Sequence, residues 1–288
     1  MKSAIGVSTW SLQQLTFTEG ADLKDIINMV ADMGVEGIDI CEEYTPCNPH
    51  PDLRKIDEIR DILDEKKLRM GAYWFITEVG NAIKSGGEER ALEVYKKNIL
   101  VAKEMGAEYA CFPFLPNFRE KSPEQIKEQF IRFFDKLLPF AEKHNMPLAH
   151  ECAREKGNGL LLEIAKHFNS KYYSVCPDLE AWRIDTPDLP LGAHADDLTA
   201  DKPTPETLEL FKECLSYSPY IHFKLLSLDE YGEEPHFPIP GLMELINQSP
   251  IEHYLCVEYE GWIPDIHPDR NCLTETKRCV EMIKKYQE

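Results

Sequence analysis

The feature that most constrains the fold is a pattern repeated eight times along the 288 residues. Each repeat is a short apolar run, a polar loop and a segment with apolar residues every three or four positions, as in a strand followed by an amphipathic helix. The predicted strands are 4–10, 37–41, 69–74, 109–113, 147–152, 173–178, 220–225 and 254–259. Strands that alternate with helices pair in parallel, and eight such units close into a (β/α)8 barrel. We therefore expect an α/β fold, a TIM barrel, in which residues 1–288 form a single domain.

Local sequence signals predict where several helices start. Asp22 precedes a stripe of apolar residues, and residues 122–125 (Ser-Pro-Glu-Gln) combine an N-cap, a proline at the first helical position and a capping-box glutamine. Residues 204–206 (Thr-Pro-Glu) repeat this arrangement. The segments 179–203 and 227–240 are long and rich in Pro, Asp and Gly, so we expect them to be active-site loops.

The chain is strongly acidic, since 51 acidic and 32 basic residues give a formal charge of -19. This balance argues against nucleic acid and against an anionic membrane surface as partners, because both are bound by clustered Lys and Arg. It is compatible with divalent cations and with neutral or weakly charged substrates.

The sequence predicts neither a membrane segment nor a disulfide framework. No apolar run approaches the ~18 residues of a transmembrane helix, and the N-terminal residues turn polar too soon for a signal peptide. The nine cysteines include no Cys-x-x-Cys pair, and several stand in apolar runs. We therefore expect a protein of the reducing cytoplasm without structural zinc.

Four consecutive predicted strands end in residues that can bind a metal ion or transfer a proton, namely Glu151, Asp178, His222 and Glu258. In a (β/α)8 barrel the carboxyl ends of the strands face the active site, and side chains alternate along each strand. The expected inward-facing pairs are Ala149 and Glu151, Cys176 and Asp178, His222 and Lys224, and Cys256 and Glu258. The residues expected to face the outer helices are Val175, Phe223 and Val257.

Three carboxylates at one end of a barrel repel one another, and burial raises their pKa values. A divalent cation removes this conflict. Carboxylate oxygens with one imidazole, and positions left for water or substrate, suit Mn2+, Mg2+ or Co2+ better than they suit structural zinc. The alternative is that these are four unrelated polar residues at strand ends, whose side chains form hydrogen bonds with loops or water.

The motifs at these strand ends resemble the xylose-isomerase-like barrel superfamily of sugar phosphate isomerases/epimerases and inosose dehydratases. The matching segments are 148–151 (LAHE), 176–178 (CPD), 221–224 (IHFK), 257–261 (VEYEG), 5–10 (IGVSTW) and 34–39 (GVEGID). The resemblance covers essentially the whole chain. It implies that Glu151, Asp178, His222 and Glu258 bind one divalent metal ion (Mn, Mg or Co, with Zn as a further option). It also implies that Glu151 and Glu258 form an acid/base pair.

The implied activity is isomerisation or epimerisation of a sugar or keto-sugar through an enediolate. Lys224 would stabilise the enediolate, or would instead pair with Glu260 or Asp178. The nearest alternative is a lyase or dehydratase, either inosose dehydratase-like or cleaving a 3-keto C-glycoside, the latter with a heteromeric partner. More distant alternatives are an endonuclease for abasic DNA, which the charge disfavours, and a sugar-binding barrel without catalysis. A homo-oligomer is compatible with the leading interpretation.

The sequence departs from the family pattern near the expected substrate. Ala181 stands where many members have a histidine, and Leu225 stands where many have an aspartate after the seventh-strand lysine. Residues 236–241 replace a glycine-rich loop. These changes leave the ligand set intact and the reaction open. The pair 177–178 and the aromatic residue that follows resemble the barrel subunit of C-glycoside-cleaving enzymes.

Candidate substrate contacts also lie at or just beyond the strand ends. They are the aromatic residues Trp10, Trp74, Phe112, Trp182 and Trp262 and the polar residues Arg183, His236 and Glu260. Aromatic faces pack against sugar C–H surfaces, which favours a neutral ring-containing substrate over a small phosphorylated one. Each tryptophan could instead fill a loop core, while Arg183 and Arg154 could form surface ion pairs. His150 falls on the outward alternation, where a packing role is expected.

Overall fold

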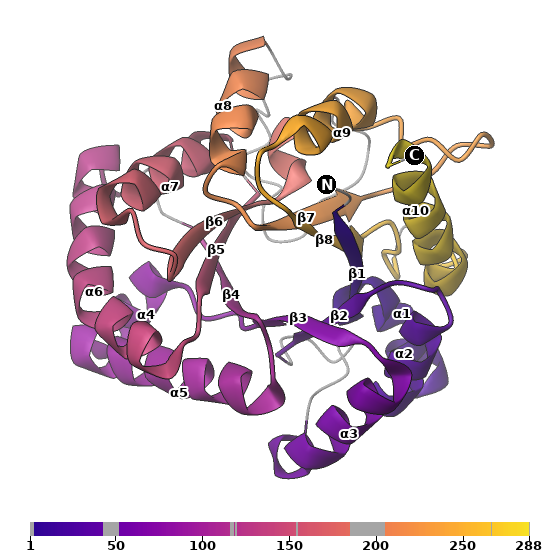
Figure 1. The fold of residues 1–288 in the computed structure, drawn as a ribbon, viewed down its shortest axis with the longest axis horizontal. Coiled ribbons are helices and arrows are strands. Elements are labelled where there is room, and N and C mark those ends of the chain that lie inside the picture. The colour runs from indigo at the N-terminus through magenta and orange to yellow at the C-terminus, as the bar shows by residue number, and fades with distance from the viewer. Residues whose placement is uncertain are drawn as a thin grey trace.

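The computed structural model describes residues 3–42, 52–115, 118, 120–153, 155–184, 205–265 and 267–287. Within them, eight parallel strands form one sheet in the order β6-β5-β4-β3-β2-β1-β8-β7. An isolated parallel bridge between Asp178 and His222 joins β6 to β7 and so connects the two ends of the sheet. Figure 1 shows the strands around the centre of the molecule with the helices outside them. The fold is the (β/α)8 barrel expected from the sequence.

The strands are β1 (Ala4–Ser8), β2 (Gly37–Cys41), β3 (Arg69–Trp74), β4 (Tyr109–Pro113), β5 (Leu148–Cys152), β6 (Tyr173–Pro177), β7 (Tyr220–Leu225) and β8 (Tyr254–Tyr259). The α-helices are α1 (Gln13–Glu19), α2 (Leu23–Ala31), α3 (Ile56–Lys66), α4 (Val79–Gly86), α5 (Glu88–Met105), α6 (Pro123–His144), α7 (Glu155–Phe168), α8 (Pro205–Leu215), α9 (Ile239–Gln248) and α10 (Cys272–Tyr286). The short 3-10 helices are η1 (Thr9–Leu12), η2 (Leu53–Lys55) and η3 (Leu179–Trp182). None of the helices in the described part of the chain is long and apolar enough to cross a membrane.

Two strands end earlier than expected because a side chain at the strand end caps a 3-10 helix. Oγ of Ser8 accepts a hydrogen bond from the Trp10 backbone N–H at 3.2 Å, which starts η1. Oδ1 of Asp178 accepts one from the Glu180 backbone N–H at 2.8 Å, which starts η3. Trp10 and Asp178 therefore lie just beyond β1 and β6 instead of inside them.

The predicted helix starts at Asp22 and Ser122 are confirmed, and each carries a complete capping box. The Asp22 carboxylate accepts from the Asp25 backbone N–H, and the Asp25 carboxylate accepts from the Asp22 backbone N–H. The same reciprocal pair joins Ser122 to Gln125 at the start of α6. The expected cap at 204, most of the expected active-site loop (185–203) and Arg154 lie outside the described residues.

Alternation along the strands separates two packed layers, as predicted. The inner layer consists of Ala72, Cys111, Ala149, Cys176, Tyr220, Tyr254 and Cys256. Val175, Phe223 and Val257 belong to the core between sheet and helices. His150 faces this outer core too, where Oη of Tyr173 lies 2.8 Å from its Nδ1.

Three tyrosines, Tyr109, Tyr220 and Tyr254, fill the barrel on the amino-terminal side of the site and are called the tyrosine layer below. The ring of Tyr220 stacks on that of Tyr109 with centroids 5.5 Å apart, and on that of Tyr254 with centroids 5.8 Å apart. A glycine makes room for this layer, because a Cβ on Gly6 would lie 1.7 Å from Oη of Tyr254. The tyrosine layer forms a floor under the strand ends.

The burial of His150 generates a test of the outer core. Burial lowers the pKa of His150 to about 3 from its usual 6.5. Between these values the unfolded chain binds a proton that the folded protein does not, so stability falls as the pH falls. We expect His150→Gln to lower the overall free energy of unfolding. Between about pH 6.5 and about pH 5, however, the variant should lose about 2 kcal/mol less of this free energy than the wild type does. Urea denaturation with a chelator present measures both.

Phe134→Leu is the matched control, because the Phe134 ring lies 5.4 Å from that of His150 and does not titrate. It should lower stability equally at both pH values. Equal acid sensitivity of His150→Gln and the wild type would contradict the assignment.

Candidate functional site

The structure brings together the four strand-end residues that the sequence predicted to share a site. Glu151 lies in β5, Asp178 follows β6, His222 lies in β7 and Glu258 lies in β8. One ligand-type atom from each lies within 4.8 Å of those of the other three. None of the four residues is more than 8% exposed. A concentrated set of three carboxyls and one imidazole therefore stands at the carboxyl end of the barrel.

His222 presents Nδ1 to two of these carboxylates. This atom lies 3.2 Å from Oε1 of Glu151 and 3.7 Å from Oε2 of Glu258. Burial opposes protonation of the ring, but Cys176 and the two carboxylates raise the pKa of His222 well above its usual 6.5. A positive charge is therefore favoured at this point of the site.

Lys224, two residues further along β7, supplies a fixed positive charge. Its Nζ lies 2.8 Å from Oδ2 of Asp178, 3.1 Å from Oε1 of Glu260 and 3.4 Å from Oε2 of Glu258. Burial disfavours the ammonium form, but these carboxylates raise the pKa of Lys224 well above its usual 10.5. The expected pairing of Lys224 with Asp178 and Glu260 is present, and the same contacts leave Nζ in the site.

Two carboxylates are oriented by hydrogen bonds that leave their second oxygen facing the centre of the site. Nε1 of Trp74 donates to Oε2 of Glu151 at 2.6 Å, while Oε1 of the same group faces His222. The Glu180 backbone N–H holds Oδ1 of Asp178, while Oδ2 faces Lys224. Both carboxylates are thus held in position before any ligand arrives.

The three carboxyl groups of the site differ in pKa. Burial raises the pKa of Glu258 to about 8 and that of Asp178 to about 6, although Lys224 opposes both shifts. Burial acts in the same direction on Glu151, but the charges of His222 and Lys224 outweigh it and lower the pKa of Glu151 to about 2. Environments that separate the pKa values of neighbouring carboxyls are typical of sites that transfer protons.

The donor set fits a divalent cation. Three carboxylates and one imidazole form an oxygen-rich set with one nitrogen, which suits Mn2+, Mg2+ or Co2+ and also accommodates Zn2+. Among the described residues, buried Nδ1 of His222 has no partner in hydrogen-bond geometry, although two carboxylates surround it. A cation at this point would compensate both the imidazole lone pair and the converging negative charges.

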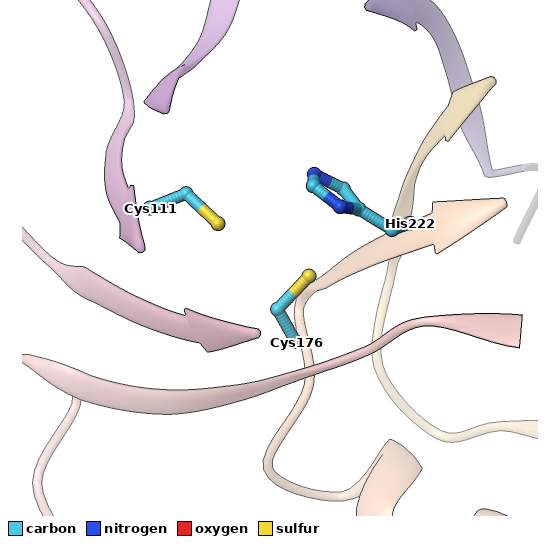
Figure 2. Close-up of side chains that lie close together, drawn as sticks. All are labelled: Cys111, Cys176 and His222. Atoms are coloured by element: carbon cyan, nitrogen blue, oxygen red, sulfur yellow. The ribbon is translucent and has the colours of Figure 1, made fainter. Parts of the chain in front are cut away.

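Two further groups of potential ligands share His222 deeper in the barrel. One is Cys111 and Cys176, whose side chains point toward His222 from β4 and β6 (Figure 2). The other is Asp39 and Cys256. Each of these two groups offers three potential ligands, whereas the carboxylate set offers four. We therefore assign the candidate metal site to the carboxylate set.

Sequence reasoning did not select Asp39 or Cys111 as residues that contact the site. Both stand on inward-facing positions, Asp39 between Gly37 and Cys41 in β2 and Cys111 in β4. The alternation rule applied to all eight strands, and not only to the last four, would have found them.

The other expected substrate contacts are distributed unevenly. Trp74 and Glu260 touch the site through Glu151 and Lys224. Trp10 is half-buried in η1. Trp262 is buried just beyond β8, with its ring 5.8 Å from that of Phe17.

The loops after β6 and β7 carry the two basic candidates. Arg183 is buried and pairs with Glu180 at 3.1 Å, so its ion pair is internal and not the surface pair considered above. Burial raises the pKa of Glu180 to about 7. His236 is half-buried, with Nε2 3.1 Å from Oγ of Ser227.

Phe112 and Trp182 differ from the expectation of a substrate contact, because both are fully buried in the outer core. Phe112 follows the inward-facing Cys111 and therefore points outward, where its ring lies 4.7 Å from that of His150. Trp182 ends η3 and turns toward α8, where Nε1 donates to the Thr207 carbonyl at 2.9 Å. Trp182 thus takes the packing role that was the alternative for the tryptophans, and Phe112 packs in the same outer core.

A family model described as the xylose isomerase-like TIM barrel matches residues 27–276. The chain belongs to this family. The match includes all four converging residues and every strand from β2 to β8. No curated protein matches the sequence of the chain.

Solved structures of other barrels share this fold at low sequence identity. An IolI protein with a bound zinc atom is 14% identical, with a TM-score of 0.72 and 99% of each chain covered. The D-psicose 3-epimerase of Clostridium cellulolyticum H10, solved with D-tagatose, is 12% identical, with a TM-score of 0.70 and 99% of each chain covered. The 3-keto-D-glucoside 4-epimerase of E. coli is 13% identical, with a TM-score of 0.66 and coverage of 99% of this chain and 100% of that one.

Removal of the Lys224 charge tests the electrostatic balance of this xylose isomerase-like site. Lys224→Met leaves Asp178, Glu258 and Glu260 without their shared cation. We expect the free energy of unfolding, measured with a chelator present, to fall by about 3 kcal/mol or more. Lys166→Met is the matched control, because Lys166 forms an exposed pair with Glu213 at 2.8 Å, and it should cost less than about 1 kcal/mol. Equal losses would show that the carboxylates do not depend on Lys224.

Proposed function

We propose that the chain is a divalent-metal-dependent isomerase or epimerase of a sugar or keto-sugar. The observation that carries the proposal is the convergence of Glu151, Asp178, His222 and Glu258 within 4.8 Å at the carboxyl end of the barrel. Membership of the xylose isomerase-like TIM barrel family supports it. The epimerases among the structural neighbours are consistent with the same chemistry on the same fold.

The four converging residues would hold one divalent ion. The preferred ions for this donor set are Mn2+, Mg2+ and Co2+, and Zn2+ is compatible with it. When bound, the ion acts as a Lewis acid that stabilises negative charge on the carbonyl and hydroxyl oxygens of the substrate.

Glu151 and Glu258 are the proposed acid/base pair. One carboxylate removes a proton from the carbon next to the substrate carbonyl, and a carboxyl group returns a proton to the same carbon or to its neighbour. Return to the opposite face of the same carbon gives an epimer, and delivery to the neighbouring carbon interconverts aldose and ketose. The Trp74 hydrogen bond keeps the Glu151 carboxylate from rotating during this transfer.

Lys224 is the proposed donor to a substrate oxygen that gains negative charge. Its Nζ is fixed by Asp178, Glu258 and Glu260, so the ammonium needs little reorganisation when the charge develops. Trp74 at the end of β3 holds its indole edge against Glu151, and we propose that the face of the same ring packs on the C–H surface of a neutral sugar ring.

The acid/base assignment is tested with Glu258→Gln, which keeps the size of the side chain and removes its charge. We expect the exchange of substrate α-protons in D2O, followed by NMR with a panel of ketoses and 3-keto-glucosides, to fall about 100- to 10,000-fold. A chelator should abolish the same exchange in the wild type. Glu36→Gln makes the same change beyond the amino-terminal end of β2, where Glu36 accepts from the Ile5 backbone N–H, and should leave exchange intact. Full, metal-independent exchange in Glu258→Gln would refute the proposal.

Product analysis distinguishes the proposed reaction from elimination. With a substrate that exchanges its α-proton, we expect chromatography and NMR to show a stereoisomer or an aldose–ketose pair of the same mass. Release of water or of an aglycone would instead assign the site to a dehydratase or a C-glycoside lyase.

A further inference from the structure

A continuous chain of hydrogen bonds runs from the candidate metal site into the barrel interior. Oη of Tyr220 lies 2.6 Å from Nε2 of His222, which is the ring nitrogen that faces away from the carboxylates. The Tyr220 hydroxyl donates a short hydrogen bond to Oδ2 of Asp39, and Oδ1 of Asp39 accepts from the Ala72 backbone N–H at 2.9 Å. Tyr220, Asp39 and His222 are each no more than 2% exposed. This series of hydrogen bonds is therefore closed to solvent along its whole length.

Backbone positions fix the geometry of this series of hydrogen bonds. Tyr220 and His222 stand two residues apart on β7, so both side chains point into the barrel. Asp39 reaches the same level from β2. The Asp39 side chain fits there because residue 71 is a glycine, since a Cβ on Gly71 would lie 2.4 Å from Oδ1 of Asp39. The neighbouring strands thus leave a space that the carboxylate of Asp39 fills.

The number of available protons sets the direction of the hydrogen bonds. The Tyr220 hydroxyl has one hydrogen, which it donates to Asp39. The Tyr220 oxygen must then accept from Nε2 of His222, so Nε2 carries a hydrogen. With Nε2 holding its hydrogen, Nδ1 is the ring nitrogen that can offer a lone pair to a ligand, and this atom lies 3.2 Å from Glu151 and 3.7 Å from Glu258.

A lone pair that faces two carboxylates is the arrangement that a metal cation would complete. Carboxylates cannot donate a hydrogen bond to Nδ1, whereas a cation bound between these groups satisfies the lone pair and both negative charges. Histidines that bind metals commonly donate their second N–H to a carboxylate, which fixes the tautomer and the ring orientation. Here the carboxylate is reached through one tyrosine.

We propose that Tyr220 and Asp39 are positioning residues that hold His222 with its hydrogen on Nε2 and so make Nδ1 the metal-binding atom. The inference rests on the metal site of the proposed function and adds its supporting residues. It also gives the tyrosine layer a second role, because Tyr220 both fills the barrel and orients His222.

The test compares Tyr220→Phe with Tyr173→Phe. Tyr173 is also buried and lies 2.8 Å from a buried histidine, His150, but this pair stands on the outer face of the sheet. Each variant removes one hydroxyl and one tyrosine–histidine hydrogen bond from the interior. A difference between them therefore reports the connection to the metal site and not a general loss of packing.

Titration of the full-length, metal-free protein with Mn2+ by calorimetry is the first measurement. We expect Tyr220→Phe to weaken the dissociation constant by about 10- to 100-fold. Tyr173→Phe should change it by less than about twofold, because His150 is not part of the ligand set. Asp39→Asn is a second variant that keeps the side-chain volume but removes the charged acceptor, and it should weaken binding in the same direction.

NMR of the protein labelled with 15N-histidine is the second measurement and requires no folded variant. In the Zn2+-loaded wild type, we expect Nε2 of His222 to carry the hydrogen and Nδ1 to be the nitrogen shifted by the metal.

The outcomes separate this inference from the proposed function. If the wild type does not bind Mn2+, the metal site itself is refuted. If the wild type binds Mn2+ but Tyr220→Phe binds it equally well, or both phenylalanine variants weaken binding alike, the positioning role is refuted while the metal site stands. A hydrogen on Nδ1 of His222 in the Zn2+-loaded wild type, with the metal on Nε2, would also overturn the inference.

Discussion

The rest of the site depends on the burial of three like-charged carboxyls at one end of a barrel. Glu151, Asp178 and Glu258 approach one another because parallel strands of a closed sheet deliver their end residues to the same mouth. Their repulsion is costly in a poorly solvated site, and it is offset by Lys224 and by the imidazole of His222. Charge compensation thus explains both the basic residues on β7 and the affinity for a cation that we propose.

The proposed function is compatible with several reactions on one fold. The converging groups lie on strands, where backbone hydrogen bonds fix their spacing, whereas the family differences noted in the sequence lie around them. Ala181 stands in η3, and Leu225 is a fully buried core residue at the end of β7. An apolar side chain in place of an aspartate removes one group that could relay a proton, while the metal-type ligands remain. Under the proposed function, the residues that generate reactivity would therefore be separate from those that choose where the proton goes.

Periodicity predicted the barrel and the inward position of the four converging residues, because both follow from local patterns of one strand at a time. Phe112 was assigned to the substrate by its position at a strand end, but its direction follows from its place after Cys111. The direction of Trp182 depends on η3, which exists because Asp178 caps it. The contact between Asp39 and Tyr220 joins residues 181 positions apart on strands that are not neighbours. No local pattern encodes such a contact.

The bridge between Asp178 and His222 has a consequence for the barrel as a whole. Every other pair of neighbouring strands is joined by a ladder of several residues. Among the described residues, β6 and β7 are joined by this one bridge and by a hydrogen bond from the Val175 backbone N–H to the Tyr217 carbonyl just before β7. Both residues also present side chains to the site. A ligand that binds these two side chains at once would cross-link the junction of the cylinder with the fewest paired residues, so that occupancy of the site and closure of the sheet would become linked equilibria.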